Sequence, residues 1–203
     1  MKTYPSPLLC LLAALCVSVM ALSPGLSRAG SPFTPIAGAW STETVDGSSV
    51  LKVDGSQHTV SATEHFPVAV YSGIKDFRDG EISVRFKPLA GKSDQAGGIF
   101  FDRKDNGDYL ILRANALENN LNLYRYASGR RTPIKEVMNA PAPAGAWHEL
   151  KLVITGASLK GYLDGALLLE HTLDHQVSGA VGLWSKDDSV TLFKDFNAVP
   201  GGQ

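Results

Sequence analysis

The chain contains 203 residues, of which 44% are hydrophobic and 19% are charged, with 20 glycines and 11 prolines. This composition is typical of a folded globular chain and excludes the disordered and collagen-like classes. The formal net charge is −1 and the pI is about 6.5, which argues against nucleic acid as a partner because phosphate contacts require clustered Lys and Arg. Beyond residue 30 no apolar stretch reaches the roughly 18 residues of a membrane span, so no membrane association is expected after signal cleavage.

Residues 1–29 have the pattern of a cleaved signal peptide. Lys2 precedes an apolar run over residues 8–22, and Ser27-Arg28-Ala29 supplies the small residues that signal peptidase requires before its cleavage site. The run is shorter than the roughly 20 residues of a membrane-spanning helix, which favours a signal peptide over an anchor. We therefore expect cleavage after Ala29 and export to the periplasm or the medium. Both cysteines lie in this segment, so the mature domain is expected to have no disulfide.

The mature chain is predicted to contain a loose N-terminal arm (30–39), one domain (40–199) and a short tail (200–203). Within the domain, hydrophobic residues recur with a period of two, which indicates strands with one buried face. Asp-Gly and Asn-Gly pairs between these runs are typical of tight hairpin turns. The predicted strands are 50–54, 58–63, 67–72, 80–88, 97–103, 108–115, 120–127, 132–137, 146–155, 158–163, 166–172, 179–184 and 190–199.

This succession of short strands without alternating helices predicts an all-β fold, an antiparallel β-sandwich or jelly roll. The alternation on the later strands also predicts part of the hydrophobic core. Its expected members are Trp147, Leu150, Leu152, Ile154, Val181, Leu183, Phe193 and Phe196.

An ordered set of short motifs runs through roughly residues 40–199. The motifs are FRDGEISVRF (77–86), GGIFFDR (97–103), DYLILR (108–113), NNLNLY (119–124), WHEL (147–150), LDG (163–165), GAVGLW (179–184) and FKDF (193–196). In this order the chain resembles the concanavalin A-like and laminin-G-like jelly rolls. It is more closely similar to the bacterial domain family named after 3-keto-disaccharide hydrolases, a family-16 glycoside hydrolase-like group.

The resemblance implies a concanavalin A-like sandwich whose partner is a carbohydrate. It also implies a hydrolase or lyase of 3-keto-glycosides, in which a base removes the acidified C2 hydrogen and the aglycone leaves C1. Such chemistry needs one general base and an oxyanion stabiliser. The Glu-x-Asp-x-x-Glu motif of jelly-roll laminarinases is absent from the sequence, which argues against their paired-carboxylate mechanism. Two alternatives remain open: a non-catalytic, lectin-like carbohydrate-binding module and a laminin-G-type protein-interaction domain.

The hairpin over residues 108–127 is the main candidate for a binding face. If Asn115 pairs with Asn120 across the turn, then Arg113 pairs with Asn122, and the leucines of both strands share the opposite face. The polar face carries Tyr109, Arg113, Asn115, Asn120, Asn122, Tyr124 and Tyr126. Aromatic rings fit the C–H faces of sugars, and amides hydrogen-bond hydroxyls. In the jelly rolls that the chain resembles, such a sheet face binds glycans, so these residues are expected to bind substrate.

The candidate general bases are two carboxylates near this face or, as an alternative, a histidine. Glu118 lies in the turn of the hairpin, and Asp102 ends the neighbouring strand. With Asn106-Gly107 as the connecting turn, Asp102 faces Ile111 on the polar side, whereas a register slip of one residue presents Arg103 instead.

Arginine supplies the other expected catalytic group, because Arg113 or Arg103 would stabilise the enolate. We therefore predict Glu118, Asp102 and Arg113 as catalytic residues and add Arg103 to the substrate-binding set.

No cofactor is expected, and no metal ligand is assigned. His171 and His175 are four residues apart but lie in a strand-to-loop context, which does not predict a metal site. Acidic residues at 105–108, 187–188 and 195 leave calcium binding open, although the EF-hand spacing is absent. Such residues are also common in turns that hold no metal.

Overall fold

The computed structural model describes residues 1–2, 31–60 and 64–202. Nearly all of the predicted signal peptide therefore lies outside the described residues. In the described part of the chain, no helix is long and apolar enough to cross a membrane.

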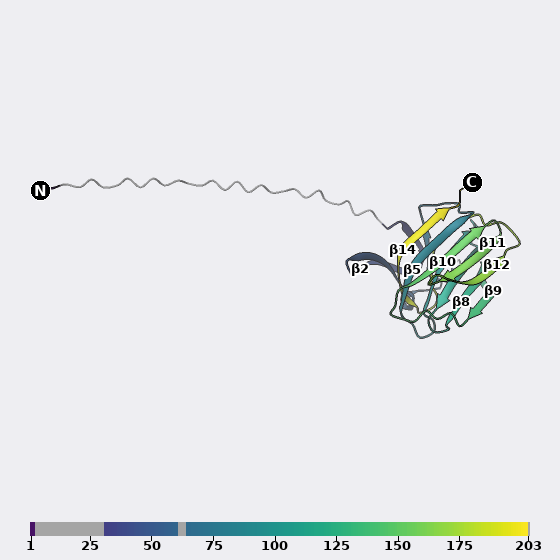
Figure 1. The fold of residues 1–203 in the computed structure, drawn as a ribbon. Coiled ribbons are helices and arrows are strands. Elements are labelled where there is room, and N and C mark those ends of the chain that lie inside the picture. Colours follow the sequence, from purple (N-terminus) through teal and green to yellow (C-terminus); the bar gives the residue numbers. More distant parts are fainter. Residues whose placement is uncertain (3–30, 61–63, 203) are drawn as a thin grey trace. The chain divides into compact units, whose positions relative to one another are not determined.

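Two seven-stranded antiparallel sheets form the domain, which confirms the predicted all-β sandwich. Sheet A contains, in spatial order, β1 (Phe33–Ala37), β4 (Val68–Tyr71), β13 (Ala180–Trp184), β6 (Ala96–Arg103), β7 (Tyr109–Asn115), β8 (Asn120–Ala127) and β9 (Arg130–Met138). Sheet B contains β12 (Ala166–Thr172), β11 (Ser158–Leu163), β10 (His148–Thr155), β5 (Gly80–Ala90), β14 (Val190–Pro200), β3 (Ser48–Asp54) and β2 (Ala39–Val45). A 3-10 turn, Gly55–Gln57, follows β3. Figure 1 shows β14, β5, β10, β11 and β12 side by side.

The hydrophobic core lies between the two sheets. Alternate residues of β5, β10 and β14 from sheet B meet alternate residues of β6, β7 and β8 from sheet A in one buried cluster. The sheets approach closely at Gly97, where an added Cβ would lie 2.6 Å from the Phe86 ring. A side chain at this position would push the sheets apart, which explains the glycine in the middle of a strand.

The predicted core is confirmed at six of its eight positions: Leu150, Leu152, Ile154, Val181, Leu183 and Phe193 are buried. Trp147 is a wrong prediction, because it lies just before β10 on the solvent side of sheet B, where Lys194 and Arg85 approach its ring at 4.5 and 5.9 Å. Phe196 is partly buried and packs against the edge of the core, on Phe33 and Tyr71.

The N-terminal segment differs most from the prediction. Residues 33–37, expected in a loose arm, form the edge strand β1, which pairs with β4 and tolerates Pro35 because an edge strand needs fewer amide donors. Strand β2 was also not predicted, since its sequence, AWSTETV, shows no hydrophobic alternation. Residues 58–60, expected to begin a strand, form none after the 3-10 turn, and residues 61–63 lie outside the described residues.

Candidate functional site

The face of sheet A that is turned away from sheet B has the side-chain order that the sequence predicts. Strands β7 and β8 pair Arg113 with Asn122 and Tyr109 with Tyr126, which confirms the predicted register. The other face of the hairpin is buried in the core and carries Leu110, Leu112, Ala114, Leu121 and Leu123. We refer to the first of these faces as the outer face of sheet A.

Arg113 is the centre of a hydrogen-bonded network on this face. Its side chain is 1% exposed; Nη1 donates to Asn120 Oδ1 at 2.6 Å, and Nη2 donates to Glu118 Oε2 at 2.7 Å and to the Tyr124 hydroxyl at 3.0 Å. Asn120 Nδ2 also donates to Glu118, and Asn122 Nδ2 donates to the Tyr124 hydroxyl at 2.9 Å. These five residues, here named the Arg113 cluster, come from β7, β8 and the turn between them.

A glycine makes room for this arrangement. Gly98 lies between Arg113 and Trp184 in the sheet, and an added Cβ would come within 2.9 Å of Arg113 Cβ and 3.3 Å of the Trp184 ring. Both large side chains can therefore lie across β6. Glycine is therefore needed at residue 98 to leave room for the Arg113 side chain, and not to form a turn.

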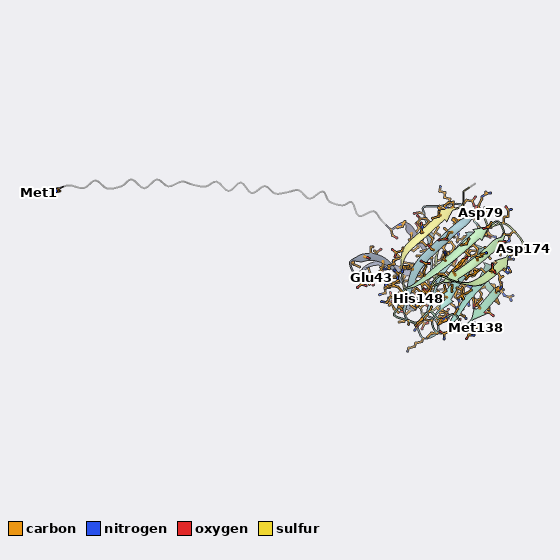
Figure 2. The ribbon with its side chains drawn as sticks, in the orientation of Figure 1. Met1, Glu43, Asp79, Met138, His148 and Asp174 are labelled. Carbon is orange, nitrogen blue, oxygen red and sulfur yellow. The ribbon has the colours of Figure 1, made fainter. Side chains whose placement is uncertain are left out.

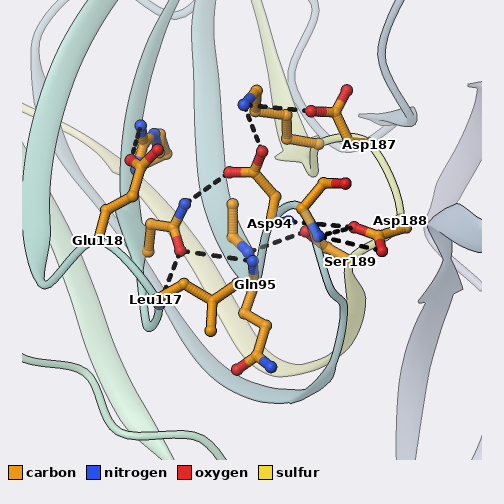
Figure 3. A network of polar contacts seen from close by, with 12 residues as sticks. Asp94, Gln95, Leu117, Glu118, Asp187, Asp188 and Ser189 are labelled. Carbon is orange, nitrogen blue, oxygen red and sulfur yellow. Dashed lines mark hydrogen bonds and ion pairs between the residues drawn. The ribbon is translucent and has the colours of Figure 1, made fainter.

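A second network begins at Asn115, the register partner of Asn120, and includes Asp94, Asp187 and Asp188 (Figure 3). Asn115 Nδ2 donates to Asp94 Oδ1 at 2.5 Å, and the other oxygen of Asp94 accepts from Lys186, which also pairs with Asp187 at 3.2 Å. The Asp188 carboxylate holds this loop by accepting the backbone amides of residues 92–94 at 2.6 to 3.2 Å. Asp94 is therefore fixed from both sides.

The pKa values of two carboxyl groups in this region are shifted in opposite directions. Partial burial raises the pKa of Glu118, but the hydrogen bond and charge of Arg113 outweigh it, so that the pKa lies below its usual value. Burial raises the pKa of Asp94, and the nearby Asp187 adds to this effect against the opposing cation of Lys186. Glu118 is thus an ionised partner of Arg113, whereas Asp94 is the carboxyl with the stronger tendency to hold a proton.

The two tyrosines at the other end of the face are covered. Tyr109 and Tyr126 stack on each other with centroids 4.7 Å apart, and each is 2% exposed. Residues 64–67 lie over them: Phe66 packs edge-on against Tyr126, and the Tyr109 hydroxyl donates to Glu64 at 2.8 Å. Burial raises the pKa of both Tyr109 and Glu64. These rings are packed and do not form an open platform.

The structure separates Asp102 from the Arg113 cluster. The predicted pairing of Asp102 with Ile111 is wrong, because Phe100 occupies that position and residues 104–108 form the loop. Asp102 has a φ of +57° and lies in a bulge, where β6 has two residues opposite one residue of β13. The bulge turns its carboxylate toward Lys104, His175 and the Ser178 amide. Arg103 instead lies close enough to Glu64 for its charge to oppose part of the rise in the pKa of Glu64 that burial causes.

The Asp102 carboxylate lines a cavity of about 370 Å³ together with Tyr109, Arg125 and His175. His175 is held between two carboxylates, Asp174 at 2.7 Å and Asp102 at 2.9 Å. Figure 2 shows Asp174 at the periphery of the domain.

Raising the pH should weaken the fold through His175. Hydrogen bonds from the ring to Asp174 and Asp102 raise the pKa of His175 above 6.5. Because the folded-state pKa is the higher one, the stabilisation is fully present below about pH 6.5 and is lost as the pH rises through the folded-state pKa. Urea unfolding across this range should show the loss in the wild type and not in His175→Asn. The control His171→Asn should keep the wild-type dependence; equal pH profiles for all three proteins would contradict the prediction.

Asp108, in one of the acidic turns, has partners within the protein. Asn106 and Asp108 hydrogen-bond to each other at 3.0 Å, and Asp108 also accepts the Ser128 amide at 2.9 Å. Within residues 31–60 and 64–202, no group of three or more His, Cys, Asp or Glu side chains is placed to hold a metal ion.

Sequence reasoning missed several side chains of this site. Asp94 lies in the loop before β6 and Lys186 in the loop after β13. They come together only because β6 and β13 pair in the sheet. Arg131 lies on β9, where its guanidinium carbon is 4.3 Å from the centre of the Tyr124 ring. The bulge in β9 between Pro133 and Lys135 reverses the alternation, so the pattern on 132–137 does not place Arg131 on the outer face. Nothing in the local pattern indicates that Phe66 folds over sheet A.

The comparisons with known proteins agree on the fold. No family model matches the sequence, and no curated protein matches it. Among solved structures, the carbohydrate-binding module CBM66 from Bacillus subtilis is similar with a TM-score of 0.66 and 17% identity, covering 81% of this chain and 93% of that one. A Bacillus subtilis protein of unknown function with a galectin-like fold has a TM-score of 0.57 and 16% identity, covering 81% and 87%.

The β-glucanase of Bacillus licheniformis is also similar, with a TM-score of 0.51 and 11% identity over 79% of this chain and 90% of that one. Likeness at such identities shows the fold alone, because one fold carries many functions. Together with the two antiparallel sheets, it shows that the chain is a β-sandwich of the concanavalin A-like and galectin-like type.

Proposed function

We propose that this chain is an exported carbohydrate-active β-sandwich that binds a glycan on the outer face of sheet A, at the Arg113 cluster. The observation that carries the proposal is a buried polar network on a face where apolar packing would stabilise the fold more simply. Arg113, Asn120, Asn122 and Tyr124 are at most 6% exposed and bonded to one another. Burying charged and amide groups costs free energy that packing alone does not require, so a functional role accounts for the network.

The groups available to a ligand lie along the rim of the cluster. The side chains of Glu118 and Asp187 are 41% and 49% exposed, and Lys186 is partly exposed beside them. Phe66 adds a partly exposed ring next to Trp184, with centroids 5.0 Å apart. Carboxylate and ammonium groups hydrogen-bond sugar hydroxyls, and the ring packs against sugar C–H groups. Arg113 itself acts by holding Glu118 and Tyr124 in place.

The fold supports a carbohydrate ligand in general terms. Two of the similar structures are described as a carbohydrate-binding module and a β-glucanase, and both share this sandwich. The resemblance of the sequence motifs to a carbohydrate-active family agrees with them. The lowered pKa of Glu118 favours binding over base catalysis at that residue, because a strongly ionised carboxylate is a weak general base.

A second candidate function is the elimination that 3-keto-glycosides undergo. A base takes the C2 proton, the C–H electron pair forms the enolate, and the bond from C1 to the aglycone then breaks. The raised pKa of Asp94 favours this candidate, because such a carboxyl is a better proton acceptor at neutral pH. Its hydrogen-bond partner Asn115 is the register partner of Asn120 in the Arg113 cluster. If the purified chain releases the aglycone from a 3-keto-glucoside and Asp94→Asn does not, elimination is supported.

A glycan array and titration calorimetry test the binding proposal. The wild type should bind at least one glycan class, and Glu118→Gln should weaken that binding by about fivefold to tenfold, because it loses a charged acceptor at the rim. The control Glu170→Gln removes an exposed carboxylate from β12 in sheet B and should bind as the wild type does. A wild type that binds no glycan would overturn the proposal and favour a protein-interaction domain.

A further inference from the structure

Arg131 is the charged side chain for which the outer face of sheet A provides the least compensation. It extends from β9, next to Tyr126 in the register, and is partly buried. Its guanidinium carbon lies 4.3 Å from the ring centre of Tyr124, 5.3 Å from that of Phe66 and 5.6 Å from that of Trp184. The cation is thus surrounded by three aromatic rings.

No carboxylate pairs with this guanidinium among the residues that the structure describes, and its buried Nη1 has no hydrogen-bond partner there. Burial lowers the pKa of Arg131, the Tyr124 ring hydroxyl opposes this, and the neighbouring guanidinium of Arg113 lowers it further. The positive charge is therefore less favourable at this position than in water. Cation–π contacts offset part of the cost but leave the N–H donors unsatisfied.

Three other arginines of the chain do have acidic partners. Arg113 pairs with Glu118 at 2.7 Å, Arg78 with Asp76 at 3.0 Å and Arg125 with Asp174 at 3.2 Å.

The carboxylates of the outer face already have partners. Glu118 is bonded to Arg113, Asp94 to Lys186 and Asn115, and Glu136 to Asn122. Asp94 and Asp187 favour the Arg131 cation only at a distance, so no carboxylate in the described part of the chain pairs with it directly.

We propose that the glycan site takes an acidic sugar, whose carboxylate pairs with Arg131 on binding. This inference rests on the proposed function, because it names the class of ligand for the same face. A guanidinium can hold a carboxylate through parallel N–H donors, which fits an arginine that is only partly buried and has no acidic partner. Its stacking on Tyr124 fixes the plane of the donor fork before the ligand arrives, and the Phe66 ring provides an apolar surface beside it for the sugar ring.

The test compares uronate oligosaccharides with their uncharged hexose counterparts, such as tetragalacturonate with galactotetraose, by titration calorimetry on the purified chain. A panel of galacturonate, glucuronate and mannuronate oligomers covers the unknown sugar identity, and a sulfated galactan oligomer separates sulfate from carboxylate recognition. Arg131→Met keeps the length and stacking of the side chain without its charge. Arg130→Met is the matched control, because the preceding residue of the same strand is exposed.

We expect the wild type to bind one uronate oligomer at least about tenfold more tightly than its uncharged counterpart, because a hydrogen bond between two charged groups is stronger than one between neutral groups. Arg131→Met should reduce this preference to less than about twofold, and Arg130→Met should keep it. The melting temperature of Arg131→Met should equal or exceed that of the wild type, because removing an unpaired, partly buried cation relieves its desolvation cost.

Three results would overturn the inference. Equal binding of neutral and acidic oligomers, unaffected by Arg131→Met, would reject the acidic ligand while leaving the proposed glycan function intact. Preference for the sulfated oligomer alone would reject the carboxylate. Absence of binding to every neutral and acidic glycan would overturn the proposed function, and the inference with it.

Discussion

Replacing Phe193 by alanine should lower the free energy of unfolding by about 3–5 kcal/mol, the range for truncating a large aromatic side chain in a core. Phe193 is 1% exposed and pairs with Phe86 between the central strands β14 and β5 of sheet B. The Trp40 ring lies 6.0 Å from it, on the neighbouring part of the sheet. These neighbours belong to regular strands and cannot collapse into the space that the ring leaves, so a cavity would remain.

Trp147→Ala is the matched comparison, because it removes a larger ring from the same sheet but from its solvent side. Arg85, Lys87 and Lys194 all lie within about 6 Å of the ring, and cation–π contacts at exposed sites contribute about 0.5–1 kcal/mol each, so we expect a loss of about 1.5–3 kcal/mol. Urea unfolding with both variants measures the difference. A Trp147→Ala loss equal to or greater than that of Phe193→Ala would contradict the assignment of the two rings to opposite faces.

The error at Trp147 shows what the alternation of hydrophobic residues can and cannot predict. Leu150, Leu152 and Ile154 point into the core, so the period of two places residue 147 on the other face. The prediction placed Trp147 in the core because tryptophan is hydrophobic, although the alternation along the strand places it on the solvent side. What the sequence does not display is the group of cations from β5 and β14 that surrounds the ring, because these strands come next to β10 only in the folded sheet.

The hairpin of β7 and β8 could be predicted fully because local information determines it. Its short turn sets the register, and the leucine face determines which side is buried. Asp102 could not be placed in the same way, since the bulge that turns it depends on the pairing of β6 with β13, some 80 residues further along the chain. The covering of Tyr109 and Tyr126 likewise depends on a segment, 64–67, whose sequence pattern shows no sign of it.

For Arg113, sequence and structure lead to different hypotheses. The polar face predicts that Arg113 itself contacts the ligand. Its three hydrogen bonds to the protein and its 1% exposure support our proposal that it positions other groups. The distinction matters for mutagenesis, because a positioning residue affects binding through the geometry of its neighbours.

Arg113→Met should weaken glycan binding by at least about tenfold, or about 1.4 kcal/mol. The change leaves Glu118 without its cation and releases the Tyr124 hydroxyl, so that the rim of the site loses its fixed geometry. It should also lower the free energy of unfolding by about 1–3 kcal/mol, because Asn120 Oδ1 loses its donor in a buried position. The exposed Arg78, changed to Met, controls for the loss of a charge and should alter neither property.

Two further variants separate positioning from folding. Tyr124→Phe removes only the hydroxyl that accepts from Arg113 and Asn122, and Gly98→Ala adds a Cβ 2.9 Å from Arg113 Cβ and 3.0 Å from the Leu112 carbonyl oxygen, which shifts β7 and Arg113 without removing any charge. Both should remain folded by circular dichroism and bind glycan less tightly than the wild type. If Arg113→Met, Tyr124→Phe and Gly98→Ala all stay folded and bind as the wild type does, then the cluster is a structural network, and the ligand must bind elsewhere on the sandwich.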